Sequence, residues 1–497
     1  MKHFDDTICA PATSVGTGAI SVIRVSGPDA LRLADSLVEF RTGAAMSSEG
    51  YSLKYGSIPG VDDVLVSIFR APHSYTGEDS VEISCHASPY IVQTILQKLV
   101  SAGGRMAEPG EFTRRAFVNG KMDLSQAEAV ADLISSGSEA AHAVALNQLK
   151  GGYSSELKAL RGQLLDLASL LELELDFSEE DVEFASRAQL QNLLDSAVLH
   201  IENLLGSFKV GNAIRNGVPV AIVGAVNAGK STLLNALLGE DRAIVSDVPG
   251  TTRDTVEETL TLGGTLFRFI DTAGIRESGD AVEKIGIERS FRCIDKAQII
   301  LGVLDGCAPL EEVCKSCSEI LGRVAGTDKK LLLLRNKVDS YDAIAPEEFP
   351  SVDRSYNCFE LKYPAFGTYN LSPVLLAEKI SDYLKRKGVP AGGELQILDI
   401  SARTGEGLDA LRSKLIAAGG FADWNGATLV TNLRHYEALE RALDSLRRVS
   451  LGLDRKTPVD LVAQDLREAI YELGTIFGAV TTDELLGNIF GRFCIGK

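Results

Sequence analysis

The segment Gly224-Ala225-Val226-Asn227-Ala228-Gly229-Lys230-Ser231 constrains the fold of this chain more than any other feature. It has the pattern G-x-x-x-x-G-K-[ST], directly after the β-type run Val220–Val223 and before a predicted helix over Thr232–Leu238. In such a strand–loop–helix, backbone N–H groups at the positive helix end face phosphate oxygens. Lys230 would place its charge between the β- and γ-phosphates, and the Ser231 hydroxyl would bind Mg²⁺. The pattern therefore predicts a nucleoside triphosphate site.

A second motif indicates which base such a site would select. Asn336-Lys337-Val338-Asp339 follows the apolar run Leu331–Leu334, and the Asp339 carboxylate would accept hydrogen bonds from N1 and the 2-amino group of guanine. Adenine cannot supply these two donors. Ser401-Ala402-Arg403, after the run Leu395–Ile400, would complete the base pocket with backbone N–H groups near guanine O6. The sequence thus predicts a site for GTP rather than ATP, and a GTPase.

Two loops between these motifs are candidates for the segments that respond to the γ-phosphate. Pro249-Gly250-Thr251-Thr252-Arg253-Asp254 contains Thr252, a natural second hydroxyl for Mg²⁺. Asp271-Thr272-Ala273-Gly274 would hold Mg²⁺ through water, and its glycine could approach the γ-phosphate. The residues expected to contact GTP are Asn227, Ala228, Gly229, Lys230, Ser231, Thr232, Ser246, Asp247, Val248, Pro249, Gly250, Thr251, Thr252, Asp271, Thr272, Ala273, Gly274, Asn336, Lys337, Asp339, Ser401, Ala402 and Arg403.

The group that orients the attacking water has two candidates. Many GTPases place a glutamine directly after the glycine of the D-x-x-G motif for this purpose, but here that position is Ile275. The carboxylates Glu277 and Glu283 follow, and residue chemistry alone does not choose between them. Arg253 and Arg276 lie near the nucleotide motifs, but each is as consistent with a surface ion pair as with an arginine finger.

Length and charge set limits on the rest of the chain. A chain of 497 residues suggests about three domains. With 50 Lys+Arg against 68 Asp+Glu, the net charge of −18 repels nucleic acid and anionic membranes, so an RNA partner would need a local basic surface. We find no apolar run of about 18 residues, and therefore expect a cytoplasmic protein with no membrane partner. The eight cysteines are scattered, and the pair Cys314 and Cys317 is more consistent with small residues on a helix than with a zinc site.

Compositional changes along the chain predict a multidomain protein. Residues 1–121 mix short β-rich runs with a helix over Tyr90–Ala102, which predicts an α+β domain. Residues 122–217 and 418–497 show three- and four-residue apolar spacing, as in Leu157–Leu175 and Tyr436–Leu451, and predict one helical bundle domain built from two chain segments. Between them, residues 218–417 alternate apolar runs with helix-length segments, which predicts an inserted α/β P-loop G domain with a mostly parallel sheet.

Motifs along almost the full length resemble the MnmE (TrmE) family of tRNA modification GTPases. The nucleotide motifs alone would indicate only the superfamily, whereas the terminal Cys-Ile-Gly-Lys sequence is specific. The segments that carry the resemblance are Asp6-Thr7-Ile8, Ile23-Arg24-Val25-Ser26-Gly27, Tyr75-Thr76-Gly77-Glu78-Asp79, Pro109-Gly110-Glu111-Phe112-Thr113, Leu124-Ser125-Gln126-Ala127-Glu128-Ala129 and Phe493-Cys494-Ile495-Gly496-Lys497.

The resemblance implies a GTPase that hydrolyses GTP to GDP and forms a homodimer through its N-terminal domains. It also implies a heterotetramer with an FAD-containing protein of the MnmG type that modifies C5 of the tRNA wobble uridine. In this family K⁺ supplies charge at the closed G domains. Asn227, Ser246, Val248 and Thr251 resemble the K⁺ ligands, and Glu283 aligns with the glutamate that orients water, which resolves the choice left open by residue chemistry.

The resemblance further implies a 5-formyltetrahydrofolate site, taken to be a one-carbon source. The residues that resemble its contacts are Arg24, Glu82, Lys121 and Lys497. Charged groups of both signs suit a glutamate tail and pterin donors, although Glu82 is also consistent with a single charge on an exposed strand face. Cys494 resembles the family cysteine required for modification, but a buried, inert thiol is as plausible on physical grounds.

Three segments depart from the family pattern. Val226 stands where proline is usual, Cys85-His86-Ala87-Ser88 replaces a Gly-His-Gly-Gly loop beside the folate residues, and Ser340–Gly393 is long for its position. Two other functions would also be consistent with the nucleotide motifs. One is a ribosome-assembly or RNA-docking GTPase switch, which usually carries a basic module that the region after Gly420 lacks. The other is a G domain attached to an N-terminal domain that serves only as a dimer clamp.

Overall fold

The computed structural model describes residues 5–14, 16–176, 187–239, 257–270, 293–340, 368, 371–389, 395–419, 428–455, 457–491 and 493–496. Contacts divide the chain into two compact units. The first comprises Met1–Ser135, Ala143–Gly206 and Leu433–Lys497, and the second comprises Ser136–His142 and Ser207–Asn432. In the described part of the chain, every helix is too short or too polar to span a membrane.

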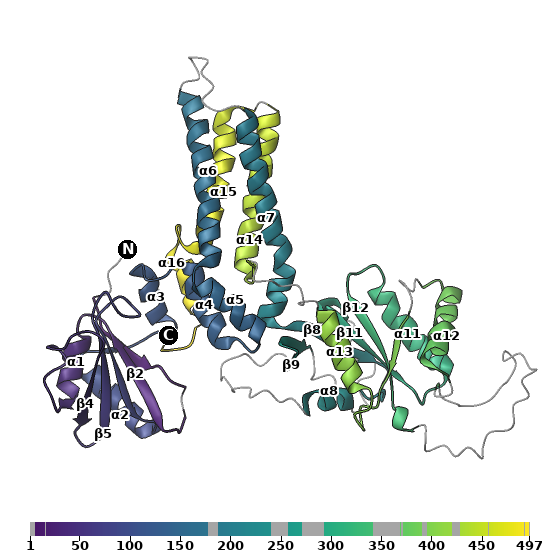
Figure 1. The fold of residues 1–497 in the computed structure, drawn as a ribbon, viewed down its shortest axis with the longest axis horizontal. Helices are drawn as coiled ribbons and strands as arrows, with labels where there is room; N and C mark the ends of the chain where they lie inside the picture. Colours follow the sequence, from purple (N-terminus) through teal and green to yellow (C-terminus); the bar gives the residue numbers. More distant parts are fainter. Residues whose placement is uncertain are drawn as a thin grey trace, which may run out of the picture. The chain divides into compact units, whose positions relative to one another are not determined.

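The N-terminal part of the first unit is built on a seven-stranded sheet of order β3-β4-β5-β6-β2-β1-β7. Its strands are β1 (Ile8–Pro11), β2 (Ile20–Ser26), β3 (Glu39–Phe40), β4 (Ser52–Ile58), β5 (Asp62–Phe69), β6 (Ser80–His86) and β7 (Arg105–Met106). Alternate residues of β5, such as Val64, Val66 and Ile68, are buried, as expected for a sheet with one covered face. Helices α1 (Ala30–Leu37) and α2 (Pro89–Ser101) cover that face (Figure 1).

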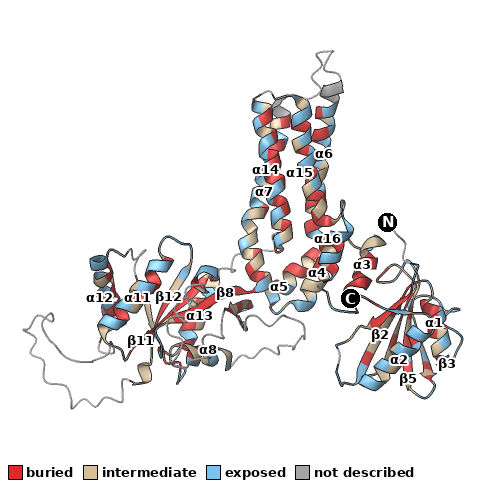
Figure 2. Ribbon diagram, turned by 180° about the vertical axis from the view of Figure 1, so that it is seen from behind, coloured by how far each residue is buried: buried red, intermediate tan, exposed pale blue. Residues whose placement is uncertain are grey.

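Long helices form the rest of the first unit, as their apolar spacing predicts. The helices are α3 (Glu111–Val118), α4 (Leu124–Ser135), α5 (Glu139–Leu149), α6 (Gly152–Asp176), α7 (Arg187–Asn216), α14 (Leu433–Asp454), α15 (Val459–Phe477) and α16 (Asp483–Phe490). The start of α5, to His142, and the end of α7, from Ser207, are assigned to the second unit. Helix α15 packs against both α14 and α6, so segments far apart in the sequence share one bundle. Figure 2 shows buried residues along these helices, with exposed residues on their other sides. The helical bundle is therefore built from two chain segments.

The second unit is the predicted α/β layer structure. Its sheet has the order β13-β12-β11-β8-β10-β9 and is parallel except between β10 and β9. The strands are β8 (Val218–Gly224), β9 (Glu258–Leu262), β10 (Thr265–Phe269), β11 (Ile299–Asp305), β12 (Lys330–Asn336) and β13 (Ile397–Asp399).

Helices cover both faces of this sheet. Helices α8 (Lys230–Gly239) and α13 (Leu408–Gly419) pack on one face. On the other lie α11 (Leu310–Val324) and α12 (Pro373–Lys387). Cys314 and Cys317 are buried in α11, in the apolar core that α11 and α12 form with the sheet. Burial raises the pKa of both thiols. They are therefore packed residues of a helix, as the sequence indicated.

Candidate nucleotide-binding site

The loop between β8 and α8 approaches its neighbours too closely for a side chain at Gly224 or Gly229. A Cβ atom added to Gly224 would overlap the carbonyl oxygen of Val303 on the neighbouring strand β11, and one on Gly229 would overlap the Asn336 amide. Gly229 and Asn227 both have positive φ angles, 95° and 61°. The first and sixth positions of the motif are thus glycine because strand ends pack directly against the loop.

Lys230 begins α8 and folds back over the loop. Its Nζ donates hydrogen bonds to the carbonyl oxygens of Gly224 and Ala225, at 3.0 and 2.7 Å. Burial lowers the pKa of Lys230 below its ordinary value. The ammonium is therefore held at the helix N-terminus, where the amides and the helix dipole favour anionic oxygens.

Asn336 joins the phosphate loop to the base loop. Its side chain is buried, with Nδ2 donating to the Ala228 carbonyl oxygen at 2.8 Å and Oδ1 accepting from the Ala402 amide at 2.9 Å. One carboxamide thus fixes two loops that come from opposite ends of the unit's sequence. Asparagine suits this position because it offers a donor and an acceptor on one short side chain.

Asp339 lies beside Ser401, as the two base-recognition motifs predict. The Ser401 hydroxyl donates to Asp339 Oδ1 at 2.7 Å, and it accepts from the Thr404 amide at 3.1 Å. Lys337 has a φ of 72°, and its Nζ forms an ion pair with Asp305 Oδ2 at 2.7 Å. These contacts orient the Asp339 carboxylate and hold the loop around it.

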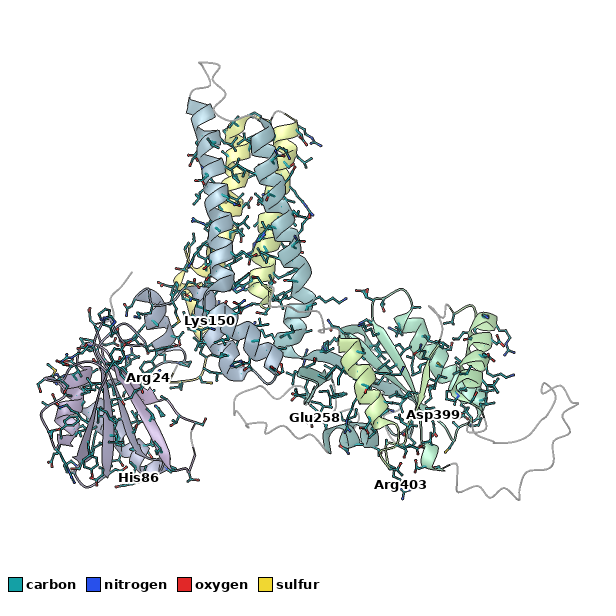
Figure 3. All side chains as sticks on the ribbon, viewed as in Figure 1. Arg24, His86, Lys150, Glu258, Asp399 and Arg403 are labelled. Atoms are coloured by element: carbon teal, nitrogen blue, oxygen red, sulfur yellow. The ribbon has the colours of Figure 1, made fainter. Side chains whose placement is uncertain are left out.

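The remaining residues of this pocket differ in their exposure. Ala402 is buried, whereas the Arg403 side chain is exposed and extends away from the sheet (Figure 3). Ser231 and Thr232 open α8 directly after Lys230. The structure therefore brings the phosphate loop and both base motifs to one edge of the sheet, at the carboxyl ends of β8, β12 and β13.

Several predicted site residues fall outside the described residues. They are Ser246, Asp247, Val248, Pro249, Gly250, Thr251, Thr252, Asp271, Thr272, Ala273, Gly274, Glu283 and Lys497, and the alternative carboxylate Glu277 is outside them as well.

Sequence reasoning missed one ion pair between β12 and β13, next to the two base motifs in the sequence. Arg335 and Asp399 are directly paired residues of β12 and β13, and the arginine binds the carboxylate through Nε and Nη2 at 2.7 and 2.6 Å. Arg335 interrupts an otherwise apolar strand, and this was the signal available in the sequence.

A second group of predicted residues meets in the N-terminal sheet. Arg24 on β2 and Glu82 on β6 are cross-strand partners joined by a 2.8 Å ion pair, and both side chains are half-buried. The Arg24 guanidinium also lies 5.1 Å from the Tyr75 ring centre and 5.6 Å from that of Phe112. The interpretation of Glu82 as a lone exposed charge is therefore wrong.

The C-terminal residues pack onto the same domain. The Gly110 amide donates to the Cys494 carbonyl oxygen at 3.4 Å, and a Cβ atom on Gly496 would overlap the carbonyl oxygen of Pro11. Pro11 pairs with Ile23, the neighbour of Arg24 in β2. The Cys494 residue is exposed, so its interpretation as a buried thiol is wrong.

Lys121 and His86 make the other two contacts of this region. Lys121 Nζ donates to the Pro72 carbonyl oxygen at 2.9 Å. In the segment that departs from the family pattern, His86 Nδ1 lies 2.8 Å from Asp62 Oδ1 and the His86 amide donates to Asp62 Oδ2 at the same distance. His86, at the end of β6, is labelled in Figure 3. Asp62 therefore anchors the start of that loop to the neighbouring strand.

Family models match nearly the whole chain. The model described as "MnmE helical domain" matches residues 124–494, and the model "GTP-binding protein TrmE N-terminus" matches residues 7–121. The chain is 48% identical over 499 residues to a tRNA modification GTPase MnmE from Bacteroides fragilis, with 99% of each chain covered. It is 47% identical to the protein of that name from Parabacteroides distasonis, covering 99% of this chain and all of the relative. The corresponding Flavobacterium johnsoniae protein is 46% identical, with 99% of each covered.

Proposed function

The chain belongs to the MnmE family of tRNA modification GTPases, and from this we propose a specific activity. It is a potassium-dependent GTPase that hydrolyses GTP to GDP and phosphate. With a flavoprotein of the MnmG type, as a heterotetramer, it modifies C5 of the tRNA wobble uridine, yielding aminomethyl or carboxymethylaminomethyl derivatives. We place this activity in the cytoplasm. The observation that carries the proposal is the full-length likeness to relatives described as tRNA modification GTPases MnmE. The hydrogen bonds that join Asp339 to Ser401 and Asn336 to Ala402 support it.

The nucleotide roles follow from the geometry of the pocket. Asp339, which accepts a hydrogen bond from Ser401, would also accept from N1 and the 2-amino group of guanine. The loop at Ala228–Lys230 would hold the phosphates, and Ser231 and Thr252 would bind Mg²⁺, which neutralises charge on the β- and γ-phosphates. Glu283 is proposed to orient the attacking water.

Asn227 fits the role of a potassium ligand. Asn227 is exposed in the loop between β8 and α8, and its φ of 61° is in the left-handed region. A carboxamide oxygen is a suitable ligand for a monovalent cation. The proposed remaining ligands are Ser246, Val248 and Thr251. The cation would supply positive charge where other GTPases use an arginine.

The N-terminal sheet offers the chemistry that a folate requires. Arg24 and Glu82 provide charges of both signs, and Tyr75 and Phe112 line the guanidinium with aromatic rings. We propose that 5-formyltetrahydrofolate binds here, with Lys121 and Lys497 as further contacts and Cys494 close by on the C-terminal tail. Burial raises the pKa of Tyr75, so its hydroxyl stays neutral and binds Thr113 at 2.9 Å.

The homodimer proposal has support from an exposed apolar surface. Leu53, Tyr55 and Leu65 on β4 and β5 are 63%, 37% and 44% exposed. Pairing places them on the same sheet face as Glu82 and Arg24, because directly opposed residues point to one side. A sheet face of this kind is normally covered. We propose that a second N-terminal domain covers it.

Analysis of tRNA nucleosides tests the proposed function directly. In a strain without this gene, mass spectrometry should find wobble uridines that lack the C5 substituent, and the wild-type gene should restore it. A complementing gene with the Glu283→Ala change should not. An unchanged nucleoside profile in the deletion strain would rule out the modification activity and favour a different output of the GTPase.

A further inference from the structure

Arg335 is a charged residue in the interior of the second unit, one position before Asn336. Only 2% of it is exposed. Side chains alternate along a strand, so Arg335 points to the face of β12 opposite to Asn336, away from the nucleotide loops. The burial of a guanidinium is unfavourable unless its donors are paired. Its partners therefore show what the residue holds in place.

The guanidinium binds two separate parts of the chain. Its Nε and Nη2 form a two-point ion pair with Asp399 at the end of β13, which is geometrically more demanding than a single contact. Its Nη1 donates to the carbonyl oxygens of Thr368 and Leu371, both at 2.7 Å. Thr368 and Leu371 belong to the long segment between the two base motifs. Arg335 therefore joins this segment to β13.

The pair with Asp399 determines how the two base motifs are spaced. Strand β13 has three residues and, among the described strands, lies at the edge of the sheet and pairs with β12 alone. So short an edge strand has few backbone bonds to define its register. The ion pair joins two directly opposed residues of β12 and β13, and it therefore adds a side-chain contact that holds this register. Asn336 and Ser401 begin their motifs one and two residues beyond this pair, so the pair is close to both motifs along the chain.

Thr368, which Arg335 binds, also contacts the chain directly after β11. Its amide and its hydroxyl both donate to the Gly306 carbonyl oxygen, at 3.0 and 3.3 Å, and the Gly306 amide donates to the Asn336 carbonyl oxygen at 3.0 Å. Gly306 follows Asp305, which holds Lys337. The contacts of Arg335 thus tie together the ends of β11, β12 and β13.

We propose that Arg335 is a positioning residue for guanine recognition. It does not touch the nucleotide, but it fixes the end of β13, Thr368 and Leu371 against β12, and so sets the position of Ser401 relative to Asp339. The inference rests on the guanine pocket proposed above. It gives a described part of the long segment a role, because the carbonyl oxygens of Thr368 and Leu371 accept hydrogen bonds from the guanidinium.

The test compares the binding of GDP and IDP to the full-length protein by calorimetry, with Mg²⁺ present. Inosine lacks the 2-amino group, so the GDP/IDP affinity ratio reports on the second hydrogen bond to Asp339. Arg335→Met should lower GDP affinity by about tenfold or more while affecting IDP less, so that the ratio falls. Arg335→Lys should be intermediate, because one ammonium cannot replace the two-point contact.

Two further variants make the outcome decisive. Asp399→Asn keeps the size of a half-buried side chain, so it can replace Arg335→Met if that variant fails to fold. It should also lower the GDP/IDP affinity ratio. Leu384→Ala is the matched control, because Leu384 is buried in the core cluster that α11 and α12 form on the same sheet face. It should lower stability and leave the ratio unchanged. If the wild type itself does not distinguish GDP from IDP, the guanine pocket is wrong. If it does, and Asp399→Asn and Arg335→Lys keep the wild-type ratio, the role of Arg335 is refuted.

Discussion

Replacement of Glu128 by glutamine should destabilise the helical bundle by about 3 kcal/mol at neutral pH. Glu128 lies on α4 and is buried, and its Oε2 lies 2.7 Å from His435 Nε2 and 3.0 Å from Arg434 Nη2. Both partners belong to the first turn of α14, which follows more than 300 residues later in the chain. Tyr153 stacks on His435 with ring centres 5.4 Å apart. The carboxylate thus joins the two segments of the bundle.

The magnitude follows from the pKa of this carboxyl group. Burial alone would raise the pKa of Glu128, but the positive charges and hydrogen bonds of His435 and Arg434 outweigh burial and lower the pKa from 4.5 to about 2. Each unit corresponds to about 1.4 kcal/mol, which gives about 3 kcal/mol. Because the folded pKa lies below the unfolded one, this stability is fully present above about pH 4.5 and is lost as the pH falls towards 2.

Hydrogen exchange of the full-length protein measures this effect locally, because a chain with several units does not unfold in one step. At neutral pH the amides of α4 should exchange about 100-fold faster in Glu128→Gln than in the wild type, and the difference should shrink below pH 4.5. Glu172→Gln is the control, since its ion pair with Arg467 is exposed and should contribute less than about 1 kcal/mol. Equal exchange of α4 in the two variants would refute the reasoning.

Three predictions concern the proposed activity. Glu283→Ala should keep GTP affinity nearly intact and slow hydrolysis by orders of magnitude in a phosphate-release assay; unchanged turnover would remove Glu283 from the mechanism. GTP hydrolysis should be faster in K⁺ than in Na⁺, and Asn227→Ala should abolish that difference, whereas equal wild-type rates in the two salts would end the potassium proposal. Arg24→Ala should weaken 5-formyltetrahydrofolate binding in calorimetry by about tenfold or more, since a charge-assisted contact is lost; undiminished binding would move the folate site elsewhere.

Local patterns in the sequence were sufficient to predict the main elements. The apolar run Leu331–Leu334 lies within β12, and Leu157–Leu175 lies within α6, because strand and helix periodicities are properties of short segments. The phosphate loop was predictable for the same reason, since its glycines and Lys230 are adjacent in sequence. The two-residue strands β3 and β7 were not, because two residues carry no periodic signal.

The contacts that hold the sites together could not be predicted in this way. Arg335 and Asp399 are 64 residues apart, and Glu128 and His435 are 307 apart, so only tertiary packing brings them into contact. The exposure of Cys494 also depends on tertiary structure. Its carbonyl oxygen binds Gly110 while the residue stays exposed, and residue type alone favours burial of a cysteine.

The central claim is that Asp339 makes this P-loop site specific for guanine, and competitive binding of GDP and XDP to Asp339→Asn tests it most directly. Xanthine carries an oxygen where guanine has its 2-amino group, so an amide in place of the carboxylate can donate to xanthine but no longer accept twice from guanine. GDP affinity should fall by about 100-fold or more, and XDP should become the preferred ligand. An Asp339→Asn protein that binds GDP as tightly as the wild type and ignores XDP would contradict the account.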